Sequence, residues 1–256
     1  MAMAHVAVVT GSTGGIGEAV ARRLAADGWA VVVSGRRAEV GEAVAESIRA
    51  GGGEATFIRA DLALPEDCAA LIRGAVTRYG RLDALVNNAA VFSQMPMEEM
   101  TPEQWDFEFA VNVRAPFLLS REALPHLRAQ GGGSIVNIGT TMVHGYGRGH
   151  LERLGYIGSK GALLALTKSM ARELAAERIR VNWVIVGWVA TPGEIALRAG
   201  QVEDPEAFLA ERGKDLPLGR MERPEEVAAG VAFLVSEEAG HVTGCELNVS
   251  GGIWVG

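Results

Sequence analysis

The chain has 256 residues, of which 48% are hydrophobic and 21% are charged, and its formal net charge is −7; this suits one large domain with a substantial core. An acidic chain gains nothing from counterion release on a phosphate backbone, so nucleic acid is not an expected partner, and without an apolar run of about 18 residues no membrane span is expected. The low cysteine content and an N-terminus without the basic segment and cleavage site of a signal peptide favour a cytoplasmic protein.

Six short apolar runs alternate with amphipathic stretches along the chain. Their apolar content is continuous, as in strands that are covered on both faces. The predicted strands are residues 5–10, 29–34, 55–59, 84–87, 134–138 and 180–186. Between them, apolar residues recur with helical spacing, for example at Ile16, Val20 and Leu24. The alternation predicts an α/β fold, a doubly wound Rossmann-type parallel sheet with helices on both faces, in a single domain over residues 1–256.

A glycine-rich loop, TGSTGGIG at residues 10–17, follows the first predicted strand and opens the first predicted helix. Backbone N–H groups at a helix N-terminus, with no Cβ in the way, can approach a pyrophosphate closely. The spacing is G-x-x-x-G-x-G rather than the commoner dinucleotide pattern G-x-G-x-x-G. A tight turn that binds nothing is the alternative. The loop lacks the Gly-Lys-Ser/Thr of a nucleotide triphosphatase, which disfavours ATP and GTP chemistry.

The end of the second predicted strand indicates which dinucleotide the fold would take. A carboxylate here would accept hydrogen bonds from the ribose of NAD, whereas an arginine would pair with the 2′-phosphate of NADP. The chain has no acid at this turn, and Arg36 and Arg37 follow the strand. NADP(H) is therefore favoured over NAD(H), the alternative being that both arginines are simply solvated.

Tyr156 and Lys160 lie four residues apart at the start of a long helical pattern, which places them on one helix face. An ammonium near a phenol favours the phenolate, so we expect a lowered tyrosine pKa. Such a tyrosine can act as a general acid toward a developing alkoxide, or as a general base toward an alcohol. Taken alone the pair is a weak signal, and an ordinary surface pair is the alternative.

Together these features resemble the short-chain dehydrogenase/reductase family over essentially the whole chain, in its branch similar to 3-oxoacyl-carrier-protein reductases or sugar and polyol dehydrogenases. The resemblance implies about seven parallel strands, a homo-oligomer that is commonly a tetramer, and hydride transfer between NAD(P)(H) and a ketone or secondary alcohol. It implies catalytic roles for Asn112, Thr140, Tyr156 and Lys160. It implies cofactor contacts at Gly11, Thr13, Gly15, Ile16, Gly17, Arg36, Asp61, Leu62, Asn88, Ala89, Tyr156, Lys160, Gly187, Val189 and Thr191.

The chain departs from the family pattern at two positions. The family's serine, about thirteen residues before the tyrosine, would fall at Val143. Thr140 aligns best in the serine's place and keeps a hydroxyl that can donate to a substrate oxygen, with Thr141 as the alternative. The proline that usually precedes Gly187 is Val186, which is expected to loosen the turn beside the nicotinamide.

Two segments are candidates for contacting the substrate. Residues 142–154 are unusual for the family, and we expect Thr141, His144 and Tyr146 to contact substrate there, a solvated loop being the alternative. No third ligand stands at a suitable spacing for a metal site. Residues 190–216 interrupt the strand–helix alternation and are predicted to form a mobile excursion over the site. The rival functions are a non-catalytic NAD(P)-binding sensor or scaffold, and a methyltransferase, which would not need the tyrosine–lysine pair.

Overall fold

The computed structural model describes residues 4–145 and 150–256, and its strands form one parallel sheet in the order β3-β2-β1-β4-β5-β6-β7. The strands are β1 (Val6–Val9), β2 (Ala30–Gly35), β3 (Glu54–Arg59), β4 (Ala84–Asn87), β5 (Gly133–Ile138), β6 (Ile179–Ile185) and β7 (Glu246–Asn248). All six runs predicted as strands pair in this sheet. The seventh strand, which only the family resemblance implied, is a three-residue edge strand.

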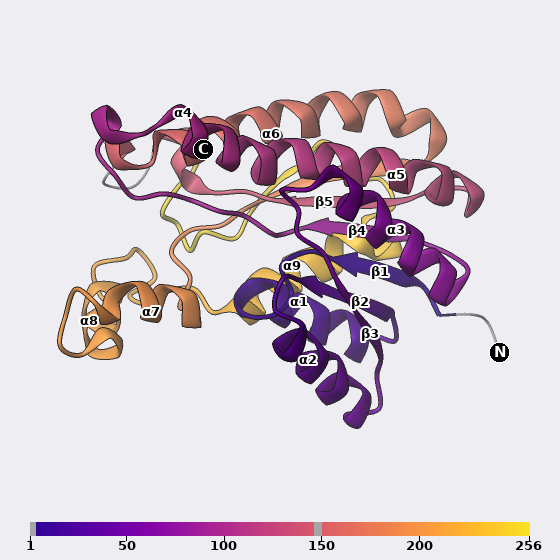
Figure 1. The fold of residues 1–256 in the computed structure, drawn as a ribbon, viewed down its shortest axis with the longest axis horizontal. Helices are drawn as coiled ribbons and strands as arrows, with labels where there is room; N and C mark the ends of the chain where they lie inside the picture. Colours follow the sequence, from indigo (N-terminus) through magenta and orange to yellow (C-terminus); the bar gives the residue numbers. More distant parts are fainter. Residues whose placement is uncertain (1–3, 146–149) are drawn as a thin grey trace.

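Helices cover both faces of the sheet, as predicted (Figure 1). One face packs against α1 (Gly15–Ala26), α2 (Ala38–Ala50) and α9 (Pro224–Val235). The other face packs against α3 (Pro65–Tyr79), α5 (Ala115–Ala129) and α6 (Leu154–Leu174). The short helix α4 (Pro102–Phe109) joins α5 through a π-helical turn, Ala110–Arg114.

The continuous apolar character of the strands has a direct structural cause. In β1, Ala7 and Val9 pack toward α1 and α9, whereas Val6 and Val8 pack toward α3 and α5. Successive side chains of a strand point to opposite faces, so a sheet covered on both sides needs apolar residues at every position. Each such valine contributes about 1.5–3 kcal/mol by its burial.

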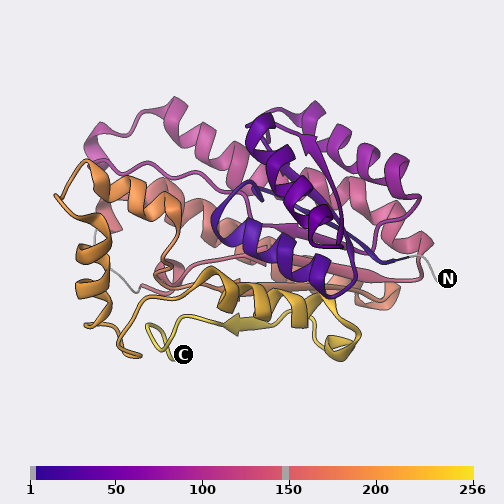
Figure 2. The same ribbon diagram turned by 90° about the horizontal axis from the view of Figure 1, so that it is seen from below.

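The strand order reverses at β1, which lies between β2 and β4. In open α/β sheets such a reversal leaves a crevice beyond the carboxyl ends of the strands, where ligands bind. Residues 190–216 hold two short helices, α7 (Pro192–Ala199) and α8 (Pro205–Gly213), whose first turns are capped by Thr191 and Asp204. Both helices lie beyond this end of the sheet, away from the N-terminus (Figures 1 and 2).

Across residues 4–145 and 150–256, no helix combines the length and the apolar character needed to cross a membrane.

Candidate active site

A cleft of about 880 Å³ opens at the carboxyl ends of the strands, and most of the predicted site residues line it. The predicted positions in its wall are Gly11, Thr13, Gly15, Ile16, Arg36, Asp61, Leu62, Asn88, Ala89, Thr140, Tyr156, Lys160, Gly187, Val189 and Thr191. Gly17, Asn112, Thr141 and His144 do not belong to this wall. Tyr146 lies outside the described residues.

The glycine loop is shaped by its own backbone and by the end of β4. Gly11 adopts φ +63°, a left-handed conformation that favours glycine. The Thr10 hydroxyl accepts hydrogen bonds from the backbone N–H groups of Asn88 (3.0 Å) and Ala89 (3.1 Å). In return, the Asn88 side chain donates to the Thr10 carbonyl oxygen at 2.9 Å. These bonds hold the loop open at the start of α1, which is the cradle that a pyrophosphate requires.

Gly17 of α1 packs against the back of this loop, next to Gly11 and Asn88. A Cβ at position 17 would stand 2.4 Å from the Gly11 carbonyl oxygen and 2.5 Å from Asn88 Nδ2. This glycine lets α1 pack closely against the loop; its direct contact with the cofactor stays a prediction.

The β2 end of the cleft carries two arginines and one carboxylate. Ser12 ties the loop to β2, because its hydroxyl accepts from the Ser34 N–H at 2.9 Å. Arg36 and Arg37 follow directly, are exposed and line the cleft. Asp61 also lines it, with Oδ1 accepting from the Ala63 N–H at 3.1 Å. A pair of cations next to the cradle suits an anionic group at this end.

Tyr156 and Lys160 both reach the cleft from the first turns of α6. Burial raises the pKa of the Tyr156 phenol to about 12, although a hydrogen bond with Thr140 and the charge of Arg153 act in the opposite direction. The expected lowering of this pKa is therefore wrong. Lys160 Nζ lies 5.9 Å from the centre of the tyrosine ring and donates to the Ile138 carbonyl oxygen at 2.7 Å. Burial lowers the pKa of Lys160 to about 8.

Thr140, rather than Thr141, occupies the position next to the tyrosine. Its side chain lines the cleft at the end of β5 and lies near enough to Tyr156 to lower the pKa of the phenol, while its hydroxyl accepts from the Met142 N–H at 3.3 Å. Thr141 is buried, and its backbone N–H donates to the Val186 carbonyl oxygen at 3.0 Å. Val143, where the family's serine would fall by counting, packs against a small apolar cluster instead. The structure thus favours the first of the two alignments left open by the sequence.

Comparison with known proteins agrees with this geometry. Residues 11–254 match the family described as enoyl-(acyl carrier protein) reductase. The chain belongs to the short-chain dehydrogenase/reductase family. It is 36% identical over 249 residues to the short-chain reductase protein NovJ of Streptomyces niveus, covering 96% of this chain and 93% of that protein. Proteins of this family are NAD(P)-dependent oxidoreductases that act on alcohol and ketone groups, and so is this one.

Two crystal structures of related dehydrogenases and reductases superpose on nearly the whole chain. A variant of the actinorhodin polyketide ketoreductase, crystallised with NADPH, has a TM-score of 0.90 at 34% identity and covers 98% of this chain and 97% of its own. A Beutenbergia cavernae protein with NADP at low occupancy has a TM-score of 0.87 at 35% identity, covering 97% and 96%. Both neighbours bind the phosphorylated dinucleotide.

Asn112, the helix asparagine of the family pattern, is buried in the π-helical turn between α4 and α5. Its Oδ1 accepts from the Val91 N–H at 2.9 Å, and its Nδ2 donates to the Val91 carbonyl oxygen at 2.8 Å and to Ser159 Oγ at 3.0 Å. π-Helical turns are frequent at functional sites. Here the turn aims the amide so that it joins the segment after β4 to the first turns of α6, which carry Tyr156 and Lys160.

His144, which was expected to contact substrate, packs between β7 and the C-terminal segment. The imidazole stacks on Trp254, with ring centres 4.1 Å apart and planes at 11°. Its Nε2 lies 3.2 Å from a carboxylate oxygen of Glu246 on β7. His144 therefore packs against the C-terminal segment, outside the wall of the cleft.

Sequence reasoning missed two buried glutamates beside the site. Glu108 of α4 is 1% exposed, one of its oxygens accepts from the Ser93 N–H, and a Cβ at Gly155 would stand 2.5 Å from the other. Glu222 is 6% exposed and accepts from the Gly187 N–H at 2.8 Å. No sequence signal could have found them, because the burial of each carboxyl group depends on segments that meet only in the folded chain.

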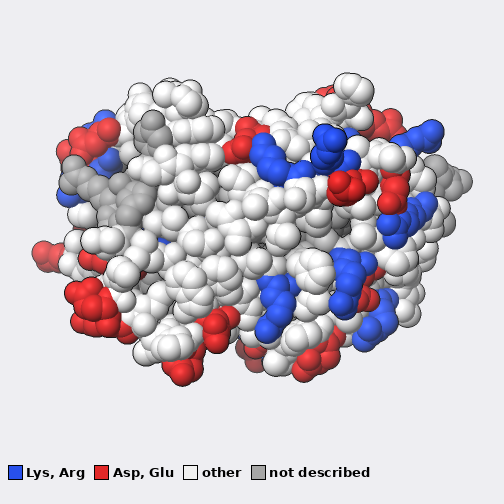
Figure 3. Space-filling model, turned by 90° about the horizontal axis from the view of Figure 1, so that it is seen from above, with Lys and Arg blue, Asp and Glu red and all other residues white. Residues whose placement is uncertain are grey.

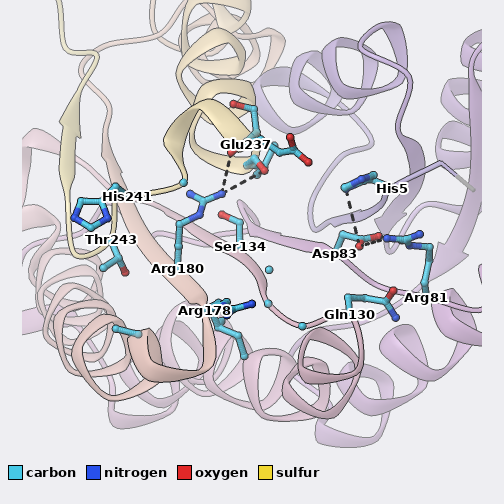
Figure 4. A pocket seen from close by; sticks show the side chains of 18 of the residues that line it. His5, Arg81, Asp83, Gln130, Ser134, Arg178, Arg180, Glu237, His241 and Thr243 are labelled. Carbon is cyan, nitrogen blue, oxygen red and sulfur yellow. Dashed lines mark hydrogen bonds and ion pairs between the residues drawn. The ribbon is translucent and has the colours of Figure 1, made fainter. Parts of the chain in front are cut away.

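A second cavity of about 930 Å³ lies at the opposite, amino-terminal ends of the strands (Figure 4). Asp83 accepts from Arg81 at 2.6 Å and from the Val6 N–H at 2.8 Å. Arg180 donates to the carbonyl oxygens of Leu234 (2.6 Å) and Ser236 (3.1 Å) at the end of α9. These charged groups bind the backbone and one another, so they stabilise strand and helix ends. Among the described residues, no cluster of three possible metal ligands is found at either cavity.

Proposed function

We propose that this family member transfers hydride between NADP(H) and a ketone or the corresponding secondary alcohol, with Tyr156 as the general acid or base. The observation that carries the proposal is that Tyr156, Lys160, Thr140 and the glycine loop share one cleft. The motifs lie far apart in the sequence, and a non-catalytic scaffold would not need to bring them together.

The tyrosine is prepared to donate a proton. With a pKa of about 12, which burial raises, the phenol is protonated at neutral pH. It can therefore give its proton to the oxygen of a carbonyl group that is being reduced. The hydroxyl of Thr140, which lies beside Tyr156 in the cleft, would provide a second hydrogen bond to that oxygen. NADPH, when bound, supplies the hydride.

The remaining residues hold the cofactor and restore the proton. The glycine loop and the N-terminus of α1 would bind the pyrophosphate, and Arg36 the 2′-phosphate. Lys160 would hold the nicotinamide ribose and stabilise the tyrosinate after transfer, with Asn112 in the proton relay. NADP(H) over NAD(H) is supported by the two arginines at the end of β2 and by the dinucleotide in both structural neighbours.

The decisive experiment is Tyr156→Phe, assayed with NADPH and a panel of ketones. Loss of the hydroxyl removes the proton donor, so turnover is expected to fall by a factor of about 10² or more. Binding of NADPH, followed by its fluorescence, is expected to remain close to wild type. Near-normal turnover in the variant would refute the assignment of Tyr156. A wild-type protein that binds NADPH but turns over no ketone would favour the sensor or scaffold.

We also propose a homo-oligomer, a tetramer by family resemblance, located in the cytoplasm. The face that carries α4, α5 and α6 has a broad uncharged surface (Figure 3). Trp105 and Phe117 are 40% and 46% exposed on α4 and α5. Aromatic residues are enriched in protein interfaces, which supports an interface on this face. Light scattering after size exclusion would measure the mass, and Phe117→Glu is expected to lower it; a wild-type monomer would contradict the proposal.

A further inference from the structure

The excursion formed by α7 and α8 begins after Thr191 and ends before Glu222, and its two ends are joined; the first turn of α7 still lines the cleft. The Ala190 N–H donates to the Glu222 carbonyl oxygen at 2.8 Å, and the Glu222 N–H donates to the Trp188 carbonyl oxygen at 3.0 Å. These bonds form an isolated parallel bridge between Val189 and Glu222. On one side of the bridge, four residues of segment 187–191 line the cleft, namely Gly187, Trp188, Val189 and Thr191. A substitution at residue 222 is therefore expected to alter the position of that wall.

The Glu222 side chain adds a third bond to the same segment. Its Oε2 accepts from the Gly187 N–H at 2.8 Å, whereas its Oε1 is buried without a hydrogen-bond partner. Gly187 is confined on another side, because a Cβ there would stand 2.8 Å from Ile253 Cδ1 and 3.0 Å from the Ser250 carbonyl oxygen. The carboxylate and the C-terminal segment thus hold Gly187 between them. Val186 replaces a proline and was expected to loosen the turn at Gly187; the Glu222 side chain holds this turn in place.

The charge of this carboxyl group is poorly compensated. Burial raises the pKa of Glu222 to about 7, against the opposing effect of the Gly187 hydrogen bond. The two charged groups that act on it are Glu226, which raises the pKa further, and Arg220, which lowers it. Arg220 is itself paired with both oxygens of Glu226, so little of its charge is available to Glu222. The carboxyl group therefore changes its ionisation within the neutral pH range.

We propose that Glu222 is a positioning residue that fastens the cleft segment 187–191 to the returning end of the α7–α8 excursion, and that its ionised form strengthens cofactor binding. A hydrogen bond to a carboxylate is stronger than one to a neutral carboxyl group. Above neutral pH, the ionised Glu222 carboxylate holds Gly187 firmly in the wall. Below neutral pH, the carboxyl group is protonated and its hydrogen bond with the Gly187 N–H weakens. The affinity component of this inference rests on the proposed binding of NADP(H), whereas the fastening itself does not.

The test compares Glu222→Gln and Glu222→Ala with the wild type, and uses Glu225→Gln as the matched control. Glu225 is an exposed acid in the first turn of α9. Hydrogen exchange of peptides covering residues 187–191 is measured without ligand at several pH values. NADPH is then titrated by fluorescence between pH 6 and pH 8.5, with unfolding temperatures recorded to show that each variant is folded.

Between pH 8.5 and pH 6, the affinity of the wild type for NADPH is expected to fall about fivefold more than the affinity of E222Q. The reason is that a charge-assisted hydrogen bond exceeds a neutral one by about 1 kcal/mol. E222Q keeps the acceptor but not the charge, so it should retain only the pH dependence of the NADPH 2′-phosphate. E222A should exchange faster in 187–191, and E225Q should match the wild type.

Two results would overturn the inference: the same pH dependence in E222Q as in the wild type, or unchanged exchange in a folded E222A. If the wild type does not bind NADPH at all, the proposed function fails instead. The exchange measurement then still decides whether Glu222 fastens the segment.

Discussion

The ammonium group of Lys160 donates a hydrogen bond of 2.7 Å to the carbonyl oxygen of Ile138, the last residue of β5. The side chain is 2% exposed, so α6 and the sheet are joined by a buried cation. A buried charge in this position lowers the stability of the fold, because burial removes its hydration. The pKa of Lys160, about 8 instead of 10.5, reflects that cost.

Lys160→Met is expected to separate stability from activity. The folded-state pKa lies below the unfolded value, so the lysine destabilises the fold at pH below about 8, and this penalty disappears as the pH rises toward 10.5. At pH 7 the variant should gain about 2 kcal/mol, after subtracting the lost bond to Ile138. Turnover should fall at least about 10²-fold. Urea unfolding at pH 7 and pH 10 measures the first effect; equal stabilisation at both pH values would contradict it.

Thr140→Val should lower kcat by about 10²-fold, the usual cost of removing one hydrogen-bond donor to a developing oxyanion. The variant keeps the shape of the side chain and loses the hydroxyl that lies beside Tyr156 in the cleft. Thr140→Ser should restore most of the rate, and Thr141→Val should change it little because Thr141 lies outside the cleft wall. Steady-state kinetics on the three variants checks this. A larger loss in the Thr141 variant than in the Thr140 variant would assign the role to the neighbouring residue.

Glu108→Gln should shift the pH profile of alcohol oxidation toward lower pH. Burial is the main cause of the raised Tyr156 pKa, and the negative charge of Glu108 adds to it. Glutamine removes this charge and keeps an oxygen for the Ser93 N–H, so the phenol should ionise more easily. The measurement is kcat/KM against pH in the oxidative direction. Glu103→Gln on the exposed side of α4 serves as the control, and an identical shift in both variants would count against a local effect.

Arg36→Ser should raise the KM for NADPH by roughly 10- to 100-fold, which corresponds to losing a hydrogen bond between charged groups. The arginine is exposed at the β2 end of the cleft, so the fold should tolerate the change. NADH lacks the 2′-phosphate and provides the internal control, with its KM expected to change little. Were both values to rise equally, the arginine would not be reading that phosphate.

The local sequence pattern was sufficient to predict six of the seven strands and the motifs that line the cleft. Apolar runs such as Val6–Val9 specify strands that are buried on both faces. Spacing places Tyr156 and Lys160 on one face of α6, and both do reach the cleft. The edge strand Glu246–Asn248 escaped this reasoning because three residues, none of them buried, carry little periodic signal.

The tertiary structure decided whatever depends on contacts between distant segments. Gly187 and Glu222, 35 residues apart, meet only when the excursion returns to the sheet. His144 stacks on Trp254 instead of facing the cleft. The direction of the Tyr156 pKa shift was also set in this way. A lysine four residues away in the sequence suggests a lower pKa. In the folded chain the lowering effects come from Thr140 and Arg153, and the removal of water by surrounding segments outweighs both.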